Sequence, residues 1–581
     1  MVEAQYPYQD AGLSVHQRVE DLLSRMPLAD KVGLMFHTIA VPADVDAVVP
    51  LFGERSLRSL VDKGLRHFNV LGSLPDGRSF AQWHNSVQSA ALRHPLGIPV
   101  TFSSDPRHHF GDNPLTQMMA GPFSLWPEPL GLAAIGSADR VREFADIVRQ
   151  EYLAVGIRVA LHPQLDVATE PRWSRINTTF GEDAELTSRL GVAYVDGLQG
   201  ARLGADSVAA MVKHFPGGGP QLDGNDPHFG WGREQVYPGD NAAYHLRPFR
   251  AALDAGAVEV MPYYGMPVGT DWDEVGFGFN KSVITGLLRD ELGFDGIVCT
   301  DWGLVSDHPD LGDLGVARAW GVEHLGPADR ALRVIEAGAD QFGGEDCTEV
   351  LLGLVRDGRV SESRIDESVR RLLRVTFTLG LFEHPFVDEE SALITLGRID
   401  FRDAGLAAQR DSLTLLTNTG LLPLARGAKV FAPQISAAAL EGHATRVDDP
   451  AAADVAVLRI KAPYEPRTEG MAALFHHGSL EFAAEEVRRI RAVCAAVPTV
   501  IDVYLDRPAV LTPLAGAAAA LIANFGVSER ALIAVLFGAA EPRGTLPFDL
   551  PRSDAAVAAS RTDVAFDTAD PLFRFGHGLR Y

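Results

Sequence analysis

The sequence predicts an α/β protein, a (β/α)8 TIM-type barrel followed by a smaller α/β sandwich domain. Short β-rich runs alternate with amphipathic segments over roughly 300 residues, which is typical of right-handed βαβ units around a parallel sheet. Polar or unusual residues follow nearly every run, as in SSDPRHH, HPQLD, KHFPGGGP, MPYYG, TDWG and FGGED. Barrel enzymes place functional groups in this way, whereas an open sheet gathers them at one switch point. The length of 581 residues also favours more than one domain.

The elements follow in the order that such a barrel requires. SVHQRVEDLLSRM predicts an amphipathic helix in which Ser14 and Gln17 form a capping box. Seven strands are then predicted, at Leu65–Leu71, Pro99–Ser104, Ile157–Leu161, Ala209–Lys213, Val258–Met261, Gly296–Thr300 and Ala339–Phe342. Amphipathic segments such as ADRVREFADIVRQEYLAVG lie between them. Seven visible units fit a (β/α)8 barrel with one degenerate unit.

The rest of the chain predicts a second domain. LFEHPFVDEESALITLG carries no strong period, so we place a linker at 383–405, between a barrel at 1–382 and a sandwich domain at 406–581. Five further β-rich runs support that domain, at Ser412–Thr417, Val430–Ala432, Val455–Ile460, Thr499–Leu505 and Leu521–Ala523.

Charge and composition restrict the partners. The formal net charge of −24 would repel nucleic acids and anionic membranes over most of the surface. No run of 18 apolar residues and no signal peptide is visible, and the three cysteines form no C-x-x-C pair. We therefore expect a cytoplasmic protein, with no nucleic-acid or membrane partner and with homodimerisation left open.

Asp301 is the sharpest candidate for chemistry. It follows the apolar run GIVCT and precedes Trp302, so a carboxylate would lie at a strand end beside an aromatic wall. A glycosidase needs such a carboxylate against the anomeric carbon of a sugar. The alternative interpretation is an aspartate that caps the next helix.

Other strand ends carry further candidates. Lys213 and His214 could hydrogen-bond sugar hydroxyls, or the lysine could form a Schiff base. In PRWSRINTTFGED, Arg172 or Arg175 could fork onto vicinal hydroxyls, and Asp105 could accept two hydrogen bonds from a sugar.

Taken in order, these motifs resemble glycoside hydrolase family 3 over nearly the whole chain. VEDLLSRMPLADKVGLM, SSDPRHH, EPRWSRINTTFGED, MVKHFPGGG, EVMPYYG and GFDGIVCTDWG are similar to barrel segments of that family. SLTLLTNTGLLPL, GTLPFDLP and PLFRFGHGLRY are similar to its C-terminal domain. This chain has Ser174 and Thr300 where the family usually has glycine and serine.

The resemblance implies a retaining, exo-acting β-glycosidase, most simply a β-D-glucosidase acting on a small-molecule or oligosaccharide β-glycoside. Asp301 would be the nucleophile, and no metal or organic cofactor would be needed. The residues expected to bind the sugar are Asp105, Arg175, Lys213, His214, Asp226, Met261, Tyr264 and Trp302. A β-xylosidase or a β-N-acetylglucosaminidase is the alternative within the family, and an aldolase-type lyase using Lys213 is a remote one.

The resemblance leaves the acid/base open. In two-domain members it is a glutamate of the second domain, and KAPYEPRTEG offers Glu465 first and Glu469 second. The family's N-acetylglucosaminidases use an Asp-x-His dyad instead, and Asp226 with His228 has that spacing. A buried aspartate could hold the tautomer of such a histidine.

Overall fold

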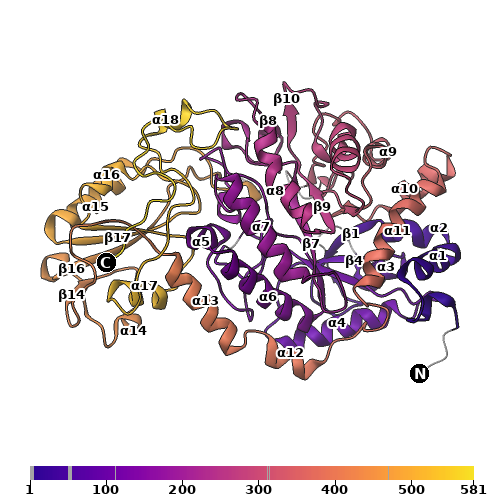
Figure 1. Ribbon diagram of the computed structural model, residues 1–581, viewed down its shortest axis with the longest axis horizontal. Coiled ribbons are helices and arrows are strands. Elements are labelled where there is room, and N and C mark those ends of the chain that lie inside the picture. The colour runs from indigo at the N-terminus through magenta and orange to yellow at the C-terminus, as the bar shows by residue number, and fades with distance from the viewer. Residues whose placement is uncertain (1–4, 50–54, 112, 310–311, 313–314, 469) are drawn as a thin grey trace.

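The computed structural model describes residues 5–49, 55–111, 113–309, 312, 315–468 and 470–581. Two bodies lie side by side in Figure 1, an indigo-to-salmon α/β barrel and an orange-to-yellow sheet domain.

Eight parallel strands form the first sheet. They are β1 (Phe36–Ala40), β4 (His67–Val70), β5 (Thr101–Ser104), β6 (Ile157–Ala160), β7 (Ala209–Phe215), β9 (Glu259–Pro262), β11 (Ile297–Val298) and β12 (Phe342–Gly343). β1 pairs with both β4 and β12. A parallel bridge between Cys299 and Gln341 joins the other edges, so the sheet closes on itself. The predicted (β/α)8 barrel is confirmed, and β1 is the eighth strand that the sequence pattern did not show.

Helices cover the outside of this barrel, as Figure 1 shows. They are α1 (Val15–Arg25), α2 (Leu28–Leu34), α3 (Leu57–Asp62), α4 (Gly77–Ala91), α5 (Pro129–Ile135), α6 (Ala138–Val155), α7 (Ala184–Gln199), α8 (Ala242–Asp254), a π-helix (Ser282–Glu291), α9 (Pro327–Ala337), α10 (Thr348–Arg356) and α11 (Glu362–Thr378). α1 begins at the predicted Ser14–Gln17 capping box. Gly156, with a φ of 82°, ends α6 in the left-handed region, so the chain can turn directly into β6.

The predicted linker at 383–405 is largely helical. It contains α12 (Glu389–Thr395) and the first part of α13 (Ile399–Ser412). α12 packs against α4, and α13 packs against α5. The segment is therefore bound to the barrel along its length, and the exact domain boundaries stay a prediction.

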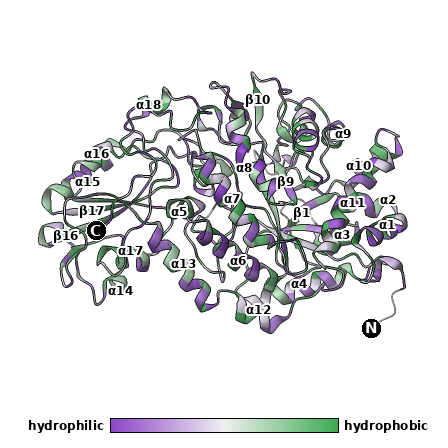
Figure 2. Cartoon of the chain, in the orientation of Figure 1, coloured by the Kyte–Doolittle hydropathy of each residue, from purple (hydrophilic) through white to green (hydrophobic). Residues whose placement is uncertain are grey.

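The second domain is built on a six-stranded sheet. Its strands are β13 (Thr414–Asn418), β14 (Lys429–Phe431), β15 (Thr445–Val447), β16 (Val455–Lys461), β17 (Thr499–Tyr504) and β18 (Ala520–Asn524), in the order β13-β18-β17-β16-β14-β15. Only β13 runs antiparallel. The helices are α14 (Ala437–Leu440), α15 (Ala484–Ala496), α16 (Thr512–Ala515), α17 (Glu529–Leu536) and α18 (Asp554–Ala558). Figure 2 shows the hydrophobic ribbon concentrated in the central strands, with mixed faces on the helices.

The two domains are joined by buried polar contacts as well as by apolar packing. The Glu182 carboxylate of the barrel accepts hydrogen bonds from the backbone N–H groups of Asp549 and Phe566. In return, Asp563 accepts hydrogen bonds from the N–H groups of Gly239 and Asn241. These contacts fix loops of the second domain over one end of the barrel.

No helix in the part of the chain that the structure describes is long and apolar enough to cross a membrane.

Candidate active site

The polar candidates lie where the barrel strands end. Asp105 follows β5 directly, Lys213 and His214 lie near the end of β7, Tyr264 comes shortly after β9, and Asp301 comes shortly after β11. The carboxyl ends of parallel strands meet at one face of a barrel. The strand register therefore brings together residues that are far apart in the sequence.

Asp301 has one occupied and one unoccupied carboxylate oxygen. The residue is 7% exposed. Its Oδ1 accepts a hydrogen bond from Trp302 N at 2.9 Å. Its Oδ2 is buried without a hydrogen-bond partner among the described residues, and lies 3.9 Å from His214 Nε2. An unpartnered carboxylate oxygen at a strand end is available to interact with a ligand.

Asp105 and Lys213 form a buried ion pair. Lys213 Nζ lies 2.8 Å from Asp105 Oδ1, and Asn69 Nδ2 donates to Asp105 Oδ2 at 3.0 Å. Each oxygen of Asp105 is therefore positioned by a donor. A Schiff base requires an uncharged amine, so this ion pair disfavours the lyase alternative.

Arg175 and His214 lie next to each other, and His214 lies close to Asp301. Arg175 Nη2 donates to Gln164 Oε1 at 3.1 Å and lies 3.4 Å from His214 Nε2, while its Nε has no partner in the described part of the chain. Arg172, by contrast, pairs with Glu170 at 2.8 Å and anchors its own loop. The geometry thus separates the two arginines that the sequence left as alternatives.

Asp226 and His228 form a closed pair. Asp226 Oδ1 accepts from His228 N at 3.0 Å and lies 2.6 Å from His228 Nδ1. Burial tends to raise the pKa of Asp226, but the charge and hydrogen bond of His228 outweigh it and lower this pKa to about 2. Ser174, which stands in place of the usual glycine, brings its hydroxyl to 3.4 Å from Asp226 Oδ2. Because its pKa is low, the Asp226 carboxylate is ionised at neutral pH.

Aromatic side chains connect this pair to the nucleophile candidate. The His228 ring lies 4.7 Å from the ring of Tyr264 and 5.0 Å from that of Phe475, which comes from the second domain. The Tyr264 hydroxyl exchanges hydrogen bonds with the backbone N and O of Trp302, both at 2.9 Å. Both domains therefore contribute to the wall beside Asp301.

Met261 and Trp302 are the remaining predicted residues. Met261 is 2% exposed and lies opposite Lys213 in the strand register. The partly buried Trp302 ring packs 5.4 Å from the His37 ring. A Cβ at Gly344 would come within 2.7 Å of Trp302 Cδ1, so glycine is required there for the indole to lie flat against the chain.

The loop that follows β16 carries the other acid/base candidates. Glu465 is exposed, and its Oε1 accepts from Ser479 N at 3.3 Å. The buried Arg507 donates to the carbonyls of Pro463 and His477 in this loop, and to the carbonyl of Arg172 in the barrel. Within the described residues no hydrogen bond or ion pair joins Glu465 to Asp301. Glu469 lies outside the described residues.

Three residues at the site were not predicted, namely Asn69, Gln164 and Asp166. Asp166 is fully buried and lies 2.7 Å from His214 Nδ1 through its Oδ2. The run HPQLD, which follows β6, was recognised as a polar strand end and contains both Gln164 and Asp166. That signal could have found these two residues, whereas Asn69 lies inside β4 and carried none.

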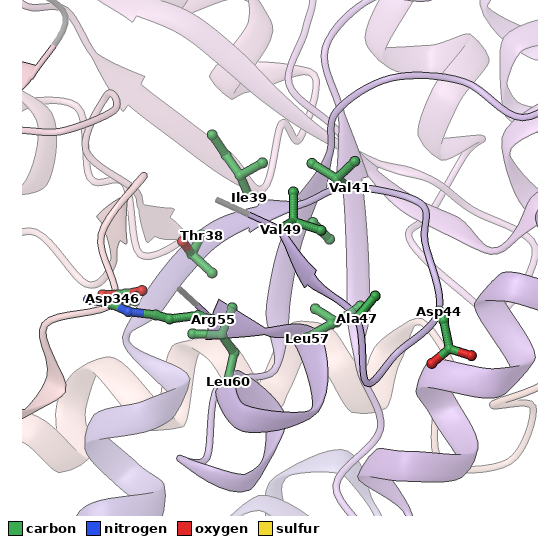
Figure 3. Close-up of a pocket in the computed structure, with 11 residues that line it drawn as sticks. Thr38, Ile39, Val41, Asp44, Ala47, Val49, Arg55, Leu57, Leu60 and Asp346 are labelled. Carbon is green, nitrogen blue, oxygen red and sulfur yellow. Dashed lines mark ion pairs between the residues drawn. The ribbon is translucent and has the colours of Figure 1, made fainter. Parts of the chain in front are cut away.

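A hollow opens beside β1 and the residues after β12. Arg55 and Asp346 form an ion pair at its edge, as Figure 3 shows. None of the predicted site residues lines this hollow.

The described part of the chain contains no group of three His, Cys, Asp or Glu residues arranged to hold a metal ion. The expectation that no metal or cofactor is needed stays a prediction.

Comparison with known proteins identifies the family. The profile of the "Glycosyl hydrolase family 3 N terminal domain" matches residues 64–375, and that of the "Glycosyl hydrolase family 3 C-terminal domain" matches residues 433–581. "Beta-glucosidase C" of Emericella nidulans is 49% identical over 582 residues, covering 99% of this chain and 94% of that protein. "Periplasmic beta-glucosidase/beta-xylosidase" of Dickeya chrysanthemi is 40% identical over 604 residues, covering 99% and 91%.

Solved structures agree with the fold. The β-glucosidase from Listeria innocua in complex with glucose superposes with a TM-score of 0.77 at 25% identity, over 97% of this chain and 83% of that one. A β-glucosidase from Erythrobacter marinus gives a TM-score of 0.82 at 23% identity, over 100% and 84%. With both domain profiles matched and relatives aligned along its whole length, the chain belongs to glycosyl hydrolase family 3.

Proposed function

We propose that this protein is a retaining, exo-acting β-D-glucosidase, which releases glucose from the non-reducing end of β-glucosides or oligosaccharides. The observation that carries the proposal is the buried, unpartnered Oδ2 of Asp301 among polar strand-end residues. The names of the relatives that align over almost the whole chain support the substrate class.

The mechanism follows from that oxygen. In the first step Asp301 Oδ2 bonds to the anomeric carbon, the glycosidic C–O bond breaks, and an acid protonates the departing oxygen. In the second step the same group, now a base, removes a proton from water. The water oxygen bonds to the anomeric carbon and Asp301 is released as a carboxylate. Two inversions give net retention.

The surrounding residues suit a pyranose with several hydroxyl groups. Asp105 supplies acceptors, Arg175 supplies donors, and the ion-paired Lys213 supplies a charge that also positions Asp105. Asp226, His214 and Tyr264 add polar atoms, while Met261 and Trp302 add apolar surface. A sugar presents both kinds of surface, since its hydroxyls lie around the ring edge and its C–H groups on the faces.

Glu465 remains our first candidate for the acid/base, with Glu469 second and His228 third. Glu465 is supported by its exposed carboxylate, which lies on a loop that Arg507 anchors to the barrel. His228 is supported by its position, because its ring packs against Tyr264 near Asp301. Glu465 and His228 lie on loops at the domain interface, so the choice among the three candidates requires a kinetic test.

Leaving groups provide that test. Dinitrophenolate departs without protonation, whereas the sugar alkoxide of cellobiose does not. Removing the true acid should slow cellobiose hydrolysis far more than hydrolysis of dinitrophenyl β-glucoside, and azide should restore turnover as glycosyl azide. Glu465→Gly, Glu469→Gly and His228→Gly are compared. Both signs in His228→Gly alone would make the Asp226–His228 pair the acid/base, and a binding residue would slow both substrates without azide rescue.

A β-xylosidase activity is the second candidate, because the Dickeya chrysanthemi relative carries both activities in its name. The test is to measure kcat/KM for an aryl β-glucoside, an aryl β-xyloside and an aryl β-N-acetylglucosaminide side by side. A higher kcat/KM on the xyloside or the N-acetylglucosaminide would overturn the glucosidase proposal. Inactivation by borohydride in the presence of substrate would instead point to the lyase alternative at Lys213.

Cytoplasmic location and homodimerisation stay proposals. The Dickeya chrysanthemi relative is named as periplasmic, which favours a different compartment for that protein. Cell fractionation and sedimentation of the purified protein would decide the two points separately.

A further inference from the structure

Asp166 is a buried carboxylate directly behind the substrate-facing histidine. It follows β6 and is 0% exposed. Its Oδ2 lies 2.7 Å from His214 Nδ1. Its Oδ1 accepts hydrogen bonds from the backbone N–H groups of His214, at 3.2 Å, and of Gly218. The carboxylate therefore holds both the ring and the backbone of His214.

The opposite side of the His214 ring faces the reaction centre. Its Nε2 lies 3.4 Å from Arg175 Nη2 and 3.9 Å from Asp301 Oδ2. Whether Nε2 carries a hydrogen decides what it does there. With a hydrogen it would donate toward Asp301 Oδ2 and stabilise the charge that the nucleophile must use. Without one it can accept a hydrogen bond from a sugar hydroxyl or from Arg175.

The contacts of Asp166 decide between these two forms. Burial, and after it the charge of Arg175, lowers the pKa of His214 well below its usual value, so the ring is neutral and has one N–H. Burial raises the pKa of Asp166 to about 6, against backbone hydrogen bonds from Gly218 and His214, so Asp166 is mainly ionised at pH 7. An ionised carboxylate only accepts hydrogen bonds, so the single N–H lies on Nδ1.

We propose that Asp166 is a positioning residue that fixes His214 in its Nδ1–H tautomer, so that Nε2 accepts a hydrogen bond from a substrate hydroxyl beside Asp301. The inference rests on the proposed glycosidase function for its substrate and on the geometry for the tautomer. The competing explanation is purely structural. In that case Asp166 would only support the turn at Gly218, where a Cβ would come within 2.7 Å of the Tyr263 ring.

Asp166→Asn separates the two explanations, because it keeps the size of the side chain and can turn an amide N–H toward His214 Nδ1. The hydrogen of His214 should then move to Nε2. We expect kcat/KM for 4-nitrophenyl β-glucoside to fall about 100-fold, less than the roughly 10⁴-fold that a wrong tautomer costs a catalytic triad, because His214 binds and does not transfer the proton.

A double-mutant cycle gives the decisive kinetic reading. If Asp166 acts through His214, Asp166→Asn should change kcat/KM by less than about threefold in a His214→Ala background. If Asp166 only supports the turn, the same factor should appear in both backgrounds, and the inference is overturned. Loss of all β-glycosidase activity in the parent protein would instead refute the proposed function, and would be seen before any variant is made.

The tautomer itself can be read without turnover. In the parent protein with ¹⁵N-labelled histidine, with His214 assigned through the His214→Ala spectrum, the ¹⁵N chemical shifts should show hydrogen on Nδ1 and a free Nε2. In Asp166→Asn the two nitrogens should exchange roles, with the hydrogen on Nε2 and a free Nδ1. Hydrogen on Nε2 in the parent overturns the inference even where Asp166→Asn does not fold.

Discussion

Glu259 offers a test of the barrel interior that does not depend on activity. It lies on β9, where Met211 of β7 and Ile297 of β11 are its partners in the strand register. The residue is 3% exposed, and the described part of the chain makes no hydrogen bond to its carboxyl group. Burial alone raises its pKa to about 8. The folded barrel therefore keeps this side chain protonated at neutral pH.

The sign of the effect on stability follows from the direction of that shift. The unfolded chain releases the proton near the ordinary pKa of 4.5, and the folded protein keeps it up to about 8. The contribution of Glu259 to the free energy of unfolding is thus most favourable below about pH 4.5. It falls as the pH rises, and the loss is complete once the pH passes the folded pKa. A shift from 4.5 to about 8, at about 1.4 kcal/mol per unit, sets an upper limit of about 5 kcal/mol. Water entry and relaxation reduce this, so we expect about 2–5 kcal/mol.

Glu259→Gln removes the titration and keeps the shape. The free energy of unfolding should be within about 1 kcal/mol of the parent at pH 4.5, and about 2–5 kcal/mol higher than the parent at pH 9. Urea unfolding followed by tryptophan fluorescence at a series of pH values measures the difference between the two proteins. Other buried acids titrate equally in both and cancel. Glu291→Gln is the matched control, because its side chain is 58% exposed and should show no such trend. A difference that stays constant from pH 4.5 to 9 would refute the reasoning.

Three further predictions concern the site. Asp301→Ala should reduce turnover of an activated aryl β-glucoside by several orders of magnitude because no glycosyl-enzyme can form, and a variant with more than about a tenth of the parent rate would disprove the assignment. A chain ending near residue 400 should be inactive even where its barrel folds, because Phe475 and the loop after β16 are missing; activity in that chain would place every catalytic group within the barrel. Arg507→Met should lower both the melting temperature and kcat/KM, by several degrees and at least tenfold, because it removes hydrogen bonds from a charged donor to several carbonyls. The exposed Lys461→Met serves as its control, and equal effects in the two variants would contradict an anchoring role for the arginine.

The strand ends could be predicted because their signal is local. An apolar run followed at once by charged or unusual residues marks Asp105, Lys213 and Asp301 without knowledge of the remaining chain. β1 was not predicted, because FHTIA is short, follows α2 almost directly, and places the polar His37 and Thr38 in the barrel wall. A short strand with polar residues at consecutive positions does not differ from a loop in hydrophobic pattern.

The partners of the candidate residues could not be predicted, because they depend on which strands become neighbours. Asp166 lies 48 positions before His214 in the chain, and only the pairing of β6 with β7 brings the two strand ends together. Edge strand β15 was missed for a related reason, since its three residues are largely exposed and are ordered by pairing with β14. In both cases tertiary contacts supply what the local sequence does not encode.

The same distinction explains why the nucleophile is easier to assign than the acid/base. Asp301 is held by the barrel's own strand, so its position follows from the fold of one domain. Glu465 and His228, two of the three acid/base candidates, lie on loops whose positions depend on packing between domains, through Phe475 against His228 and through Arg507 beside the loop of Glu465. A substitution at that interface should therefore affect substrates that need protonation of the leaving group more than those that do not. We therefore propose that the domain interface takes part in catalysis by positioning the loops that carry Glu465 and His228.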